Sequence, residues 1–134
     1  MKKLLIFTLV ALLSIFFIDR SYSKQNQAEL QQMLISKIEE QQLVNNEIKV
    51  NFEELFDFKW DKVYVFTPYT SIKEVNNQLG FTWLGAKSTG IDRRDDVNLI
   101  VFVENNQVAQ YIELPRSYGD IVAKGEEAFE INGS

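Results

Sequence analysis

The chain has 134 residues, 46% of them apolar, and carries a formal net charge of −5. It contains neither histidine nor cysteine, which excludes disulfides, thiolate catalysis, attachment of a lipid through cysteine and every site built on imidazole. The acidic balance also argues against a nucleic-acid partner, because affinity for a phosphate backbone depends on basic side chains. No cofactor is expected from this composition.

The first 23 residues have the order of a signal peptide. Two lysines precede an apolar run over residues 4–18, and Ser21 and Ser23 place small side chains where a signal peptidase cleaves. We expect cleavage after Ser23 and export to the periplasm, the cell surface or the medium. An uncleaved membrane anchor over residues 4–18 is the alternative, because a span needs roughly 17–25 residues. Contact with a membrane is expected only in that case.

Residues 24–134 are expected to form a single domain that begins with a helix. The stretch Lys24–Asn46 lacks proline and glycine and repeats apolar residues four apart, which predicts an amphipathic helix from near Gln27 to near Asn45 and Asn46. The alternation that follows, over residues 48–52, predicts an edge strand with one buried face. Residues 53–59 favour either one helical turn or an irregular loop.

A strand with two apolar faces is predicted over residues 60–67. On one side lie Val63 and Val65, and on the other lie Trp60, Tyr64 and Phe66. Pro68 ends this strand. A short helix follows, for which Ser71 and Glu74 have the spacing of a capping box and Gly80 is the expected left-handed cap.

The remaining chain predicts a loop, a hairpin and a tail. Residues 81–96 favour a short extended piece and a mobile loop. Residues 97–114 favour a hairpin that turns at Asn105 and Asn106, since asparagine tolerates the positive φ of a type I′ turn. That turn sets a register in which Phe102 and Tyr111 share one side. Residues 117–134 are expected to be a partly flexible tail.

These elements predict an α+β fold: a small antiparallel sheet of three to four strands, with the N-terminal amphipathic helix and the second short helix packed on one face. No repeat or linker interrupts residues 24–134.

One set of residues recurs in a recognisable order: Trp60, Asp61, Pro68, Tyr69, Leu79, Gly80, Pro115 and Arg116. With these residues, and above all over residues 58–69, the chain resembles a group of small, uncharacterised exported or lipid-anchored bacterial proteins. The shared order is Phe-x-Trp-Asp, an aromatic strand, Pro-Tyr, a helix ending in Leu-Gly and a hairpin ending near Pro-Arg, over about residues 47–120. The chain departs from these proteins by lacking a lipobox cysteine. The arrangement of a short helix and antiparallel strands also resembles the fold of the outer-membrane assembly lipoprotein SmpA/OmlA and of the β-lactamase inhibitor protein. Neither resemblance implies an enzyme.

Aromatic side chains are the first candidates for a binding surface. Two helices and a tail must cover both apolar faces of the sheet, and the first helix has only a narrow apolar stripe, so part of one face is predicted to stay open to a partner. The alternative is that the chain covers these rings and they are ordinary core residues. The candidate aromatic residues are Trp60, Tyr64, Phe66, Phe102 and Tyr111.

Polar candidates lie near the ends of the strands. Asp61, Tyr69 and Arg116 could form a polar site, although a structural ion pair between Asp61 and Arg116 is favoured. Two other constellations have weaker support. A carboxylate pair for glycoside hydrolysis could come from Glu53, Glu54, Asp57 and Asp61, and Asp92, Asp95 and Asp96 could gather calcium, although Arg93 and Arg94 favour a neutralised loop instead.

The sequence favours a non-enzymatic exported module that binds another protein through an aromatic and acidic surface, as an inhibitor or immunity protein would. Two alternatives remain: a carboxylate-dependent hydrolase of cell-wall polymers, and a structural protein held at the membrane by residues 4–18. The oligomeric state is left open.

Overall fold

The computed structural model describes residues 27–44, 48–123 and 128–132. The expected signal peptide, its cleavage point and the alternative anchor over residues 4–18 lie outside these ranges. Within them, no helix combines the length and the apolar character needed to cross a membrane.

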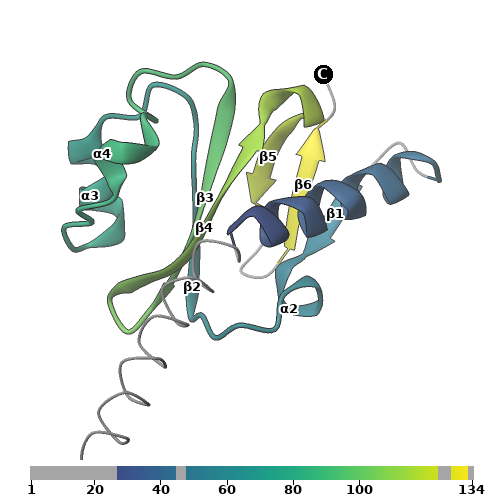
Figure 1. The fold of residues 1–134 in the computed structure, drawn as a ribbon, viewed down its shortest axis with the longest axis horizontal. Helices are drawn as coiled ribbons and strands as arrows, with labels where there is room; N and C mark the ends of the chain where they lie inside the picture. The colour runs from purple at the N-terminus through teal and green to yellow at the C-terminus, as the bar shows by residue number, and fades with distance from the viewer. Residues whose placement is uncertain (1–26, 45–47, 124–127, 133–134) are drawn as a thin grey trace, which may run out of the picture.

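Two antiparallel sheets and several helices confirm the α+β class (Figure 1). The first sheet has the strand order β2-β3-β4 and the second has the order β1-β6-β5. The strands are β1 (Ile48–Asn51), β2 (Lys62–Phe66), β3 (Val97–Glu104), β4 (Gln107–Pro115), β5 (Asp120–Ala123) and β6 (Ala128–Asn132). The helices are the N-terminal helix over residues 27–42, α2 (Phe52–Leu55), α3 (Ile72–Leu79), α4 (Ala86–Thr89) and the single 3₁₀ turn η1 (Arg116–Tyr118).

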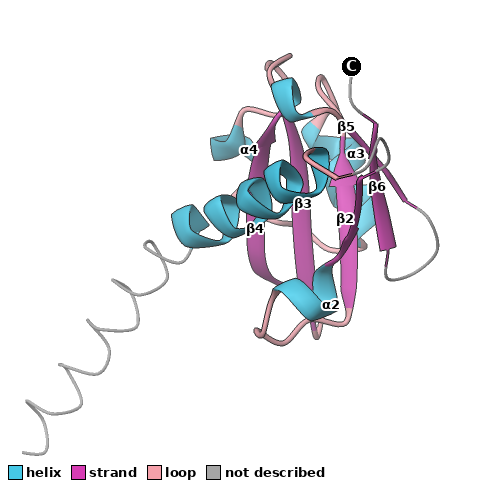
Figure 2. Ribbon diagram, turned by 90° about the vertical axis from the view of Figure 1, so that its right-hand side faces the viewer, coloured by secondary structure: helices cyan, strands magenta, loops and turns pink. Residues whose placement is uncertain are grey.

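The N-terminal helix is held to the domain by its apolar stripe, as its periodicity predicts. Leu30, Leu34, Ile35 and Ile38 are buried against β1, β3 and β4 in one core cluster. Figure 2 shows this helix crossing the sheet of β2, β3 and β4. The described helix ends at residue 42, before the asparagine pair that was expected to end it.

The helices do not share one face of the sheet, so that part of the prediction is wrong. The N-terminal helix and β1 pack on the face that carries Ile100 and Phe102. In contrast, α3 and α4 pack on the opposite face, around Phe66 and Leu99 (Figure 1). Both faces of the sheet are therefore covered. Each face carries apolar side chains, and these must be buried against another layer of secondary structure.

The start and end of α3 follow the predicted signals. The Ser71 hydroxyl accepts a hydrogen bond from the backbone N–H of Glu74 at 3.1 Å, and Gly80 takes the left-handed conformation with φ 79°. The Glu74 carboxylate accepts from Gln78 at 2.9 Å. Ser71 as the N-cap and Gly80 as the C-cap are therefore confirmed, whereas among the described residues the Glu74 carboxylate does not return a bond to the Ser71 N–H, as a full capping box would.

The segment between α3 and β3 is more ordered than the mobile loop that was expected. It contains α4, which buries Ala86 and ends at Gly90 with φ 70°. Arg94 then ties the charged run to its surroundings by donating to Thr89 O, Asp96 and Glu113. Buried Ala86, Thr89 and Ile91 and the hydrogen bonds of Arg94 together hold this segment in place.

The hairpin turn is confirmed, but its register is wrong beyond the first residues. Asn105 and Asn106 have φ 51° and 59°, and Val103 opposes Val108 as predicted. The register then shifts by one, because Ala109 is an extra residue that has no partner in β3. Past this bulge Tyr111 opposes Val101. A slip of one residue moves each later side chain of β4 to the other face.

The segment expected as a partly flexible tail contains β5 and β6. β6 pairs with β1 and also with β5, which places the end of the described chain beside its first strand (Figure 1). β1 is an edge strand, as its alternation predicts, since Ile48 and Val50 are buried and Lys49 is exposed. The sheet of β1, β6 and β5 therefore helps to cover the sheet of β2, β3 and β4. This cover was not predicted from the sequence, because residues 117–134 were expected to be a tail.

Candidate functional site

A groove of about 580 Å³ is the candidate site, and it lies beside the turn of the β3–β4 hairpin. Two segments build it: the stretch that runs from α2 to the approach to β2, and the end of β3 with the hairpin turn. Phe58 and Trp60 contribute half-buried rings, while Glu53, Asp61 and Glu104 contribute carboxylates. The remaining lining residues are Phe56, Lys59 and Asn105.

Phe102 forms the floor beneath these rings. It is fully buried, and four aromatic rings surround it edge-on at centroid distances of 5.0–5.6 Å. Edge-to-face contacts at this distance are the favoured arrangement for aromatic pairs. Phe102 therefore fixes the rings that line the groove but does not itself face a partner. The four rings are Phe52, Phe56, Phe58 and Trp60.

Asp61 is oriented by the hairpin turn. Its Oδ2 accepts a hydrogen bond from the Asn105 N–H at 3.1 Å, and its own N–H donates to Val103 O at 2.8 Å. One carboxylate oxygen is thus used to hold the turn. Among the described residues, none donates to the other oxygen, which leaves it able to accept from a ligand.

Of the four carboxylates considered for hydrolysis, Glu53 and Asp61 line the groove, whereas Glu54 and Asp57 do not. Glu53 is exposed on the first turn of α2, where its N–H donates to Asn51 Oδ1 at 3.0 Å. Glu104 was not a candidate and joins them from the end of β3. Within the described residues, no ion pair neutralises Glu53 or Glu104.

Trp60 does not share a side with Tyr64 and Phe66, as was predicted. Tyr64 and Phe66 stack at 6.3 Å on the face covered by α3 and α4, while Trp60 packs into the cluster on the other face. The reason is that β2 begins at Lys62, so its alternation does not extend back to Trp60.

Phe102 and Tyr111 also lie on opposite faces, because of the bulge at Ala109. Tyr111 is half-buried and packs edge-on against Trp83 at 5.2 Å. Phe66 and Phe102 are sealed in the core, so the prediction of an open aromatic face is wrong for these two rings. The half-buried Tyr64 and Tyr111 flank Val101 in neighbouring strands.

Tyr69 and Arg116 lie at the other end of the sheet from Asp61. Tyr69 is exposed, and its N–H donates to Ile91 O at 2.9 Å. Arg116 pairs with Asp120 at 3.2 Å and also donates to Asp95 O. The predicted ion pair between Asp61 and Arg116 is therefore wrong, because β3 separates the two residues along its whole length.

A polar network connects β3 to β5 at this end. The Asn98 side chain, fully buried, donates to Asp120 Oδ1 at 3.3 Å, and the same oxygen accepts from Arg116. The hydrogen bonds from Arg116 and then from Asn98 lower the pKa of the Asp120 carboxyl. A hydrogen bond from Arg94 likewise lowers the pKa of Asp96.

These shifts predict lower stability in acid. A carboxyl whose folded pKa is depressed stabilises the fold above its unfolded pKa, and this contribution is lost as the pH falls through the folded value. Asp120→Asn should therefore be less stable than wild type at pH 6, and the gap should narrow as the pH falls below about 4. Urea midpoints of the two proteins measured across this range test the prediction, and a gap that widens in acid would contradict it.

The calcium candidates do not converge. Among the described residues, no group of three or more acidic side chains is placed to hold a metal ion. Asp96 pairs with Arg94, and Asp92 lies 3.9 Å from Arg93. Within the charged run, Arg94 and Asp96 therefore form one close ion pair, and Asp92 and Arg93 lie near the distance limit of another.

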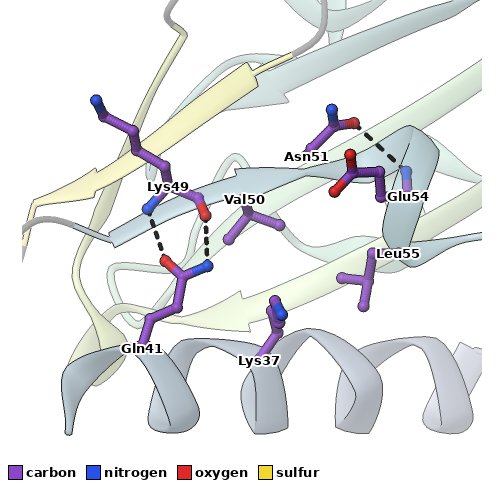
Figure 3. Close-up of a pocket in the computed structure, with 7 residues that line it drawn as sticks. All are labelled: Lys37, Gln41, Lys49, Val50, Asn51, Glu54 and Leu55. Atoms are coloured by element: carbon purple, nitrogen blue, oxygen red, sulfur yellow. Dashed lines mark hydrogen bonds between the residues drawn. The ribbon is translucent and has the colours of Figure 1, made fainter. Parts of the chain in front are cut away.

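A second pocket, of about 410 Å³, lies between the N-terminal helix and the segment of β1 and α2 (Figure 3). The Gln41 amide donates to Lys49 O at 2.7 Å and accepts from Lys49 N–H at 2.8 Å, in the manner of a neighbouring strand. Lys37 rises from the helix towards β1, and Glu54 faces the pocket from α2 (Figure 3). These contacts attach the helix to an edge strand, so we assign the pocket a structural role.

Sequence reasoning missed Glu104, Phe56 and Phe58 as site residues. Phe56 and Phe58 fall in the segment for which one helical turn and an irregular loop were both left open, and Glu104 is an ordinary residue before a turn. The one available signal was the Asn105–Asn106 turn, which places Glu104 at the tip of the hairpin. Pairing of β2 with β3, which brings the turn to Asp61, is not encoded locally.

No protein-family model matches the chain, and no curated protein or solved structure matches it either. The resemblance at residues 58–69 therefore stays a prediction.

Proposed function

We propose that this chain is a non-enzymatic, exported module that binds another protein, of an inhibitor or immunity type, through the groove at the hairpin turn. The observation that carries the proposal is the composition of this groove: half-buried Phe58 and Trp60 lie beside three carboxylates, those of Glu53 and Asp61 from the same stretch of chain and that of Glu104 from the end of β3. Trp60 and Asp61 are the two predicted binding residues that lie here.

Partly exposed aromatic rings are typical anchors of protein interfaces. Tryptophan is enriched among the residues that dominate binding energy, and such residues work best when surrounding groups exclude water. Trp60 meets this description because Phe102 fixes its ring and the rim residues surround it. A partner that covers the groove would therefore gain from a ring whose orientation is already set.

Replacing Trp60 should weaken the partner complex. An extract of envelope proteins from the source cells is passed over the immobilised protein, and the retained partner is identified and purified. The dissociation constant of the complex is then measured by calorimetric titration. Trp60→Ala should raise the dissociation constant at least about tenfold, since interface anchors contribute roughly 2 kcal/mol or more. Tyr111→Ala, on the opposite face of the sheet, should change it less than about twofold.

Each variant must keep the wild-type urea midpoint within error, because Trp60 also packs on Phe102. Where Trp60→Ala destabilises the fold, Trp60→Phe keeps a ring on Phe102 and should give an intermediate affinity. A complex that is sensitive to Tyr111→Ala and insensitive to Trp60→Ala would move the interface to the other face and contradict the proposal.

The groove also gives the hydrolase alternative structural support, because Glu53 and Asp61 line it together. Turnover of cell-wall fragments that Asp61→Asn abolishes without unfolding would replace the binding proposal. The membrane-held alternative depends on residues 4–18, and mass spectrometry of the native N-terminus tests it.

A further inference from the structure

We propose that the groove at the hairpin turn receives an arginine side chain of the partner protein. This inference rests on the proposed function and adds the chemistry of the group that occupies the groove. The juxtaposition that carries it is the pair of half-buried rings, Phe58 and Trp60, with the carboxylates of Glu53, Asp61 and Glu104 around them.

Charge complementarity favours a cationic group. The groove carries three carboxylates and one ammonium group, that of Lys59, so its net charge is −2. Among the described residues no arginine or lysine pairs with Glu53 or Glu104, whereas Asp96, Glu113 and Asp120 elsewhere on the surface each have an arginine partner. The chain's overall charge of −5 adds a long-range attraction for a basic partner.

The aromatic rings distinguish arginine from a simple cation. A guanidinium group is planar, stacks on aromatic faces and donates in a fork that suits a carboxylate. Its apolar stem can lie along Phe58 and Trp60 while the head reaches the rim. Asp61 is suited to accept, because Asn105 holds one of its oxygens and so fixes the direction of the other.

The experiment uses two short peptides, acetyl-Ala-Arg-Ala-amide and the same peptide with citrulline in place of arginine. Citrulline keeps the length and planarity of the side chain but carries no charge. Binding is followed by the fluorescence of Trp60 in a Trp83→Phe variant, because Trp83 lies on the other face of the sheet. The arginine peptide should bind about tenfold more tightly than the citrulline peptide, and added salt should weaken it.

A matched pair of charge variants tests where the cation binds. Removing two charges at the rim, by Glu53→Gln with Glu104→Gln, should weaken the arginine peptide about tenfold. Removing two charges from the exposed side of the N-terminal helix, by Glu29→Gln with Glu39→Gln, should change its affinity less than about twofold.

Equal affinity for the two peptides, equal effects of the two double variants, or no saturable binding would each overturn the inference. A protein partner that needs Trp60 but ignores the rim charges would leave the proposed function standing and remove the arginine. The reverse result, tight arginine binding with no protein partner, would support the groove chemistry and count against the proposed function.

Discussion

Replacing Phe102 by alanine should lower the free energy of unfolding by about 3–5 kcal/mol, the range for deleting a fully buried phenylalanine. Phe102 is 0% exposed and contacts four other rings. Its removal takes one partner from each of these rings at once. The gap cannot close easily, because the rings come from α2, from the segment after it and from the approach to β2, and each is held by its own backbone.

Urea denaturation followed by far-ultraviolet circular dichroism measures this loss. Leu84→Ala is the matched control, because Leu84 is 90% exposed and its truncation should change stability by less than about 0.5 kcal/mol. A loss below about 1 kcal/mol for Phe102→Ala would mean that the ring cluster is not packed as described. Phe102→Leu should fall between wild type and Phe102→Ala, because it keeps part of the volume.

Features set by neighbouring residues could be predicted from the sequence. Ser71 caps α3 and Gly80 ends it because their backbone and side-chain preferences act within a few residues. The Asn105–Asn106 turn and the alternation of β1 follow from the same kind of local rule. These elements were found at the expected places because no distant contact opposes the local preference.

Features set by pairing between distant segments could not be predicted. The bulge at Ala109 has no signature in the sequence, yet it reverses the faces of Tyr111 and the residues after it. β6 lies between β1 and β5 and pairs with both, and these are contacts with distant segments that its five residues do not predict by themselves. The prediction therefore underestimated how much of the sheet of β2, β3 and β4 is covered by the rest of the chain. Phe66 and Phe102, which were predicted to be open to a partner, are buried core residues.

The candidate site was predicted in part for the same reason. Trp60 was selected as one of the aromatic residues and Asp61 as a polar residue near a strand end, and both line the groove. Glu104 reaches them through the pairing of β2 with β3, a contact between residues about forty positions apart in the sequence. Tyr69 and Arg116 were grouped with Asp61 because all three lie near strand ends. In the structure, Tyr69 and Arg116 lie at one end of the sheet and Asp61 lies at the other.

Replacing Leu34 by alanine should lower the free energy of unfolding by about 2–5 kcal/mol, and the loss should report packing alone. Leu34 is 0% exposed in the middle of the N-terminal helix, where it packs into the cluster that contains Ile100 and Ile112. Alanine has the highest helix propensity, so the substitution does not weaken the helix itself. Urea midpoints of wild type and Leu34→Ala measure the loss.

The matched control is Leu43→Ala, the same chemical change at a position that is 88% exposed just beyond the helix. It should change stability by less than about 0.5 kcal/mol. Equal effects at the two positions would contradict the packing of the helix on the sheet. A large loss at Leu34 alone would show that the helix is a required layer of the domain, since it shields Ile100 and Ile112 from water on the same face of the sheet that carries Phe102 and the rings of the groove.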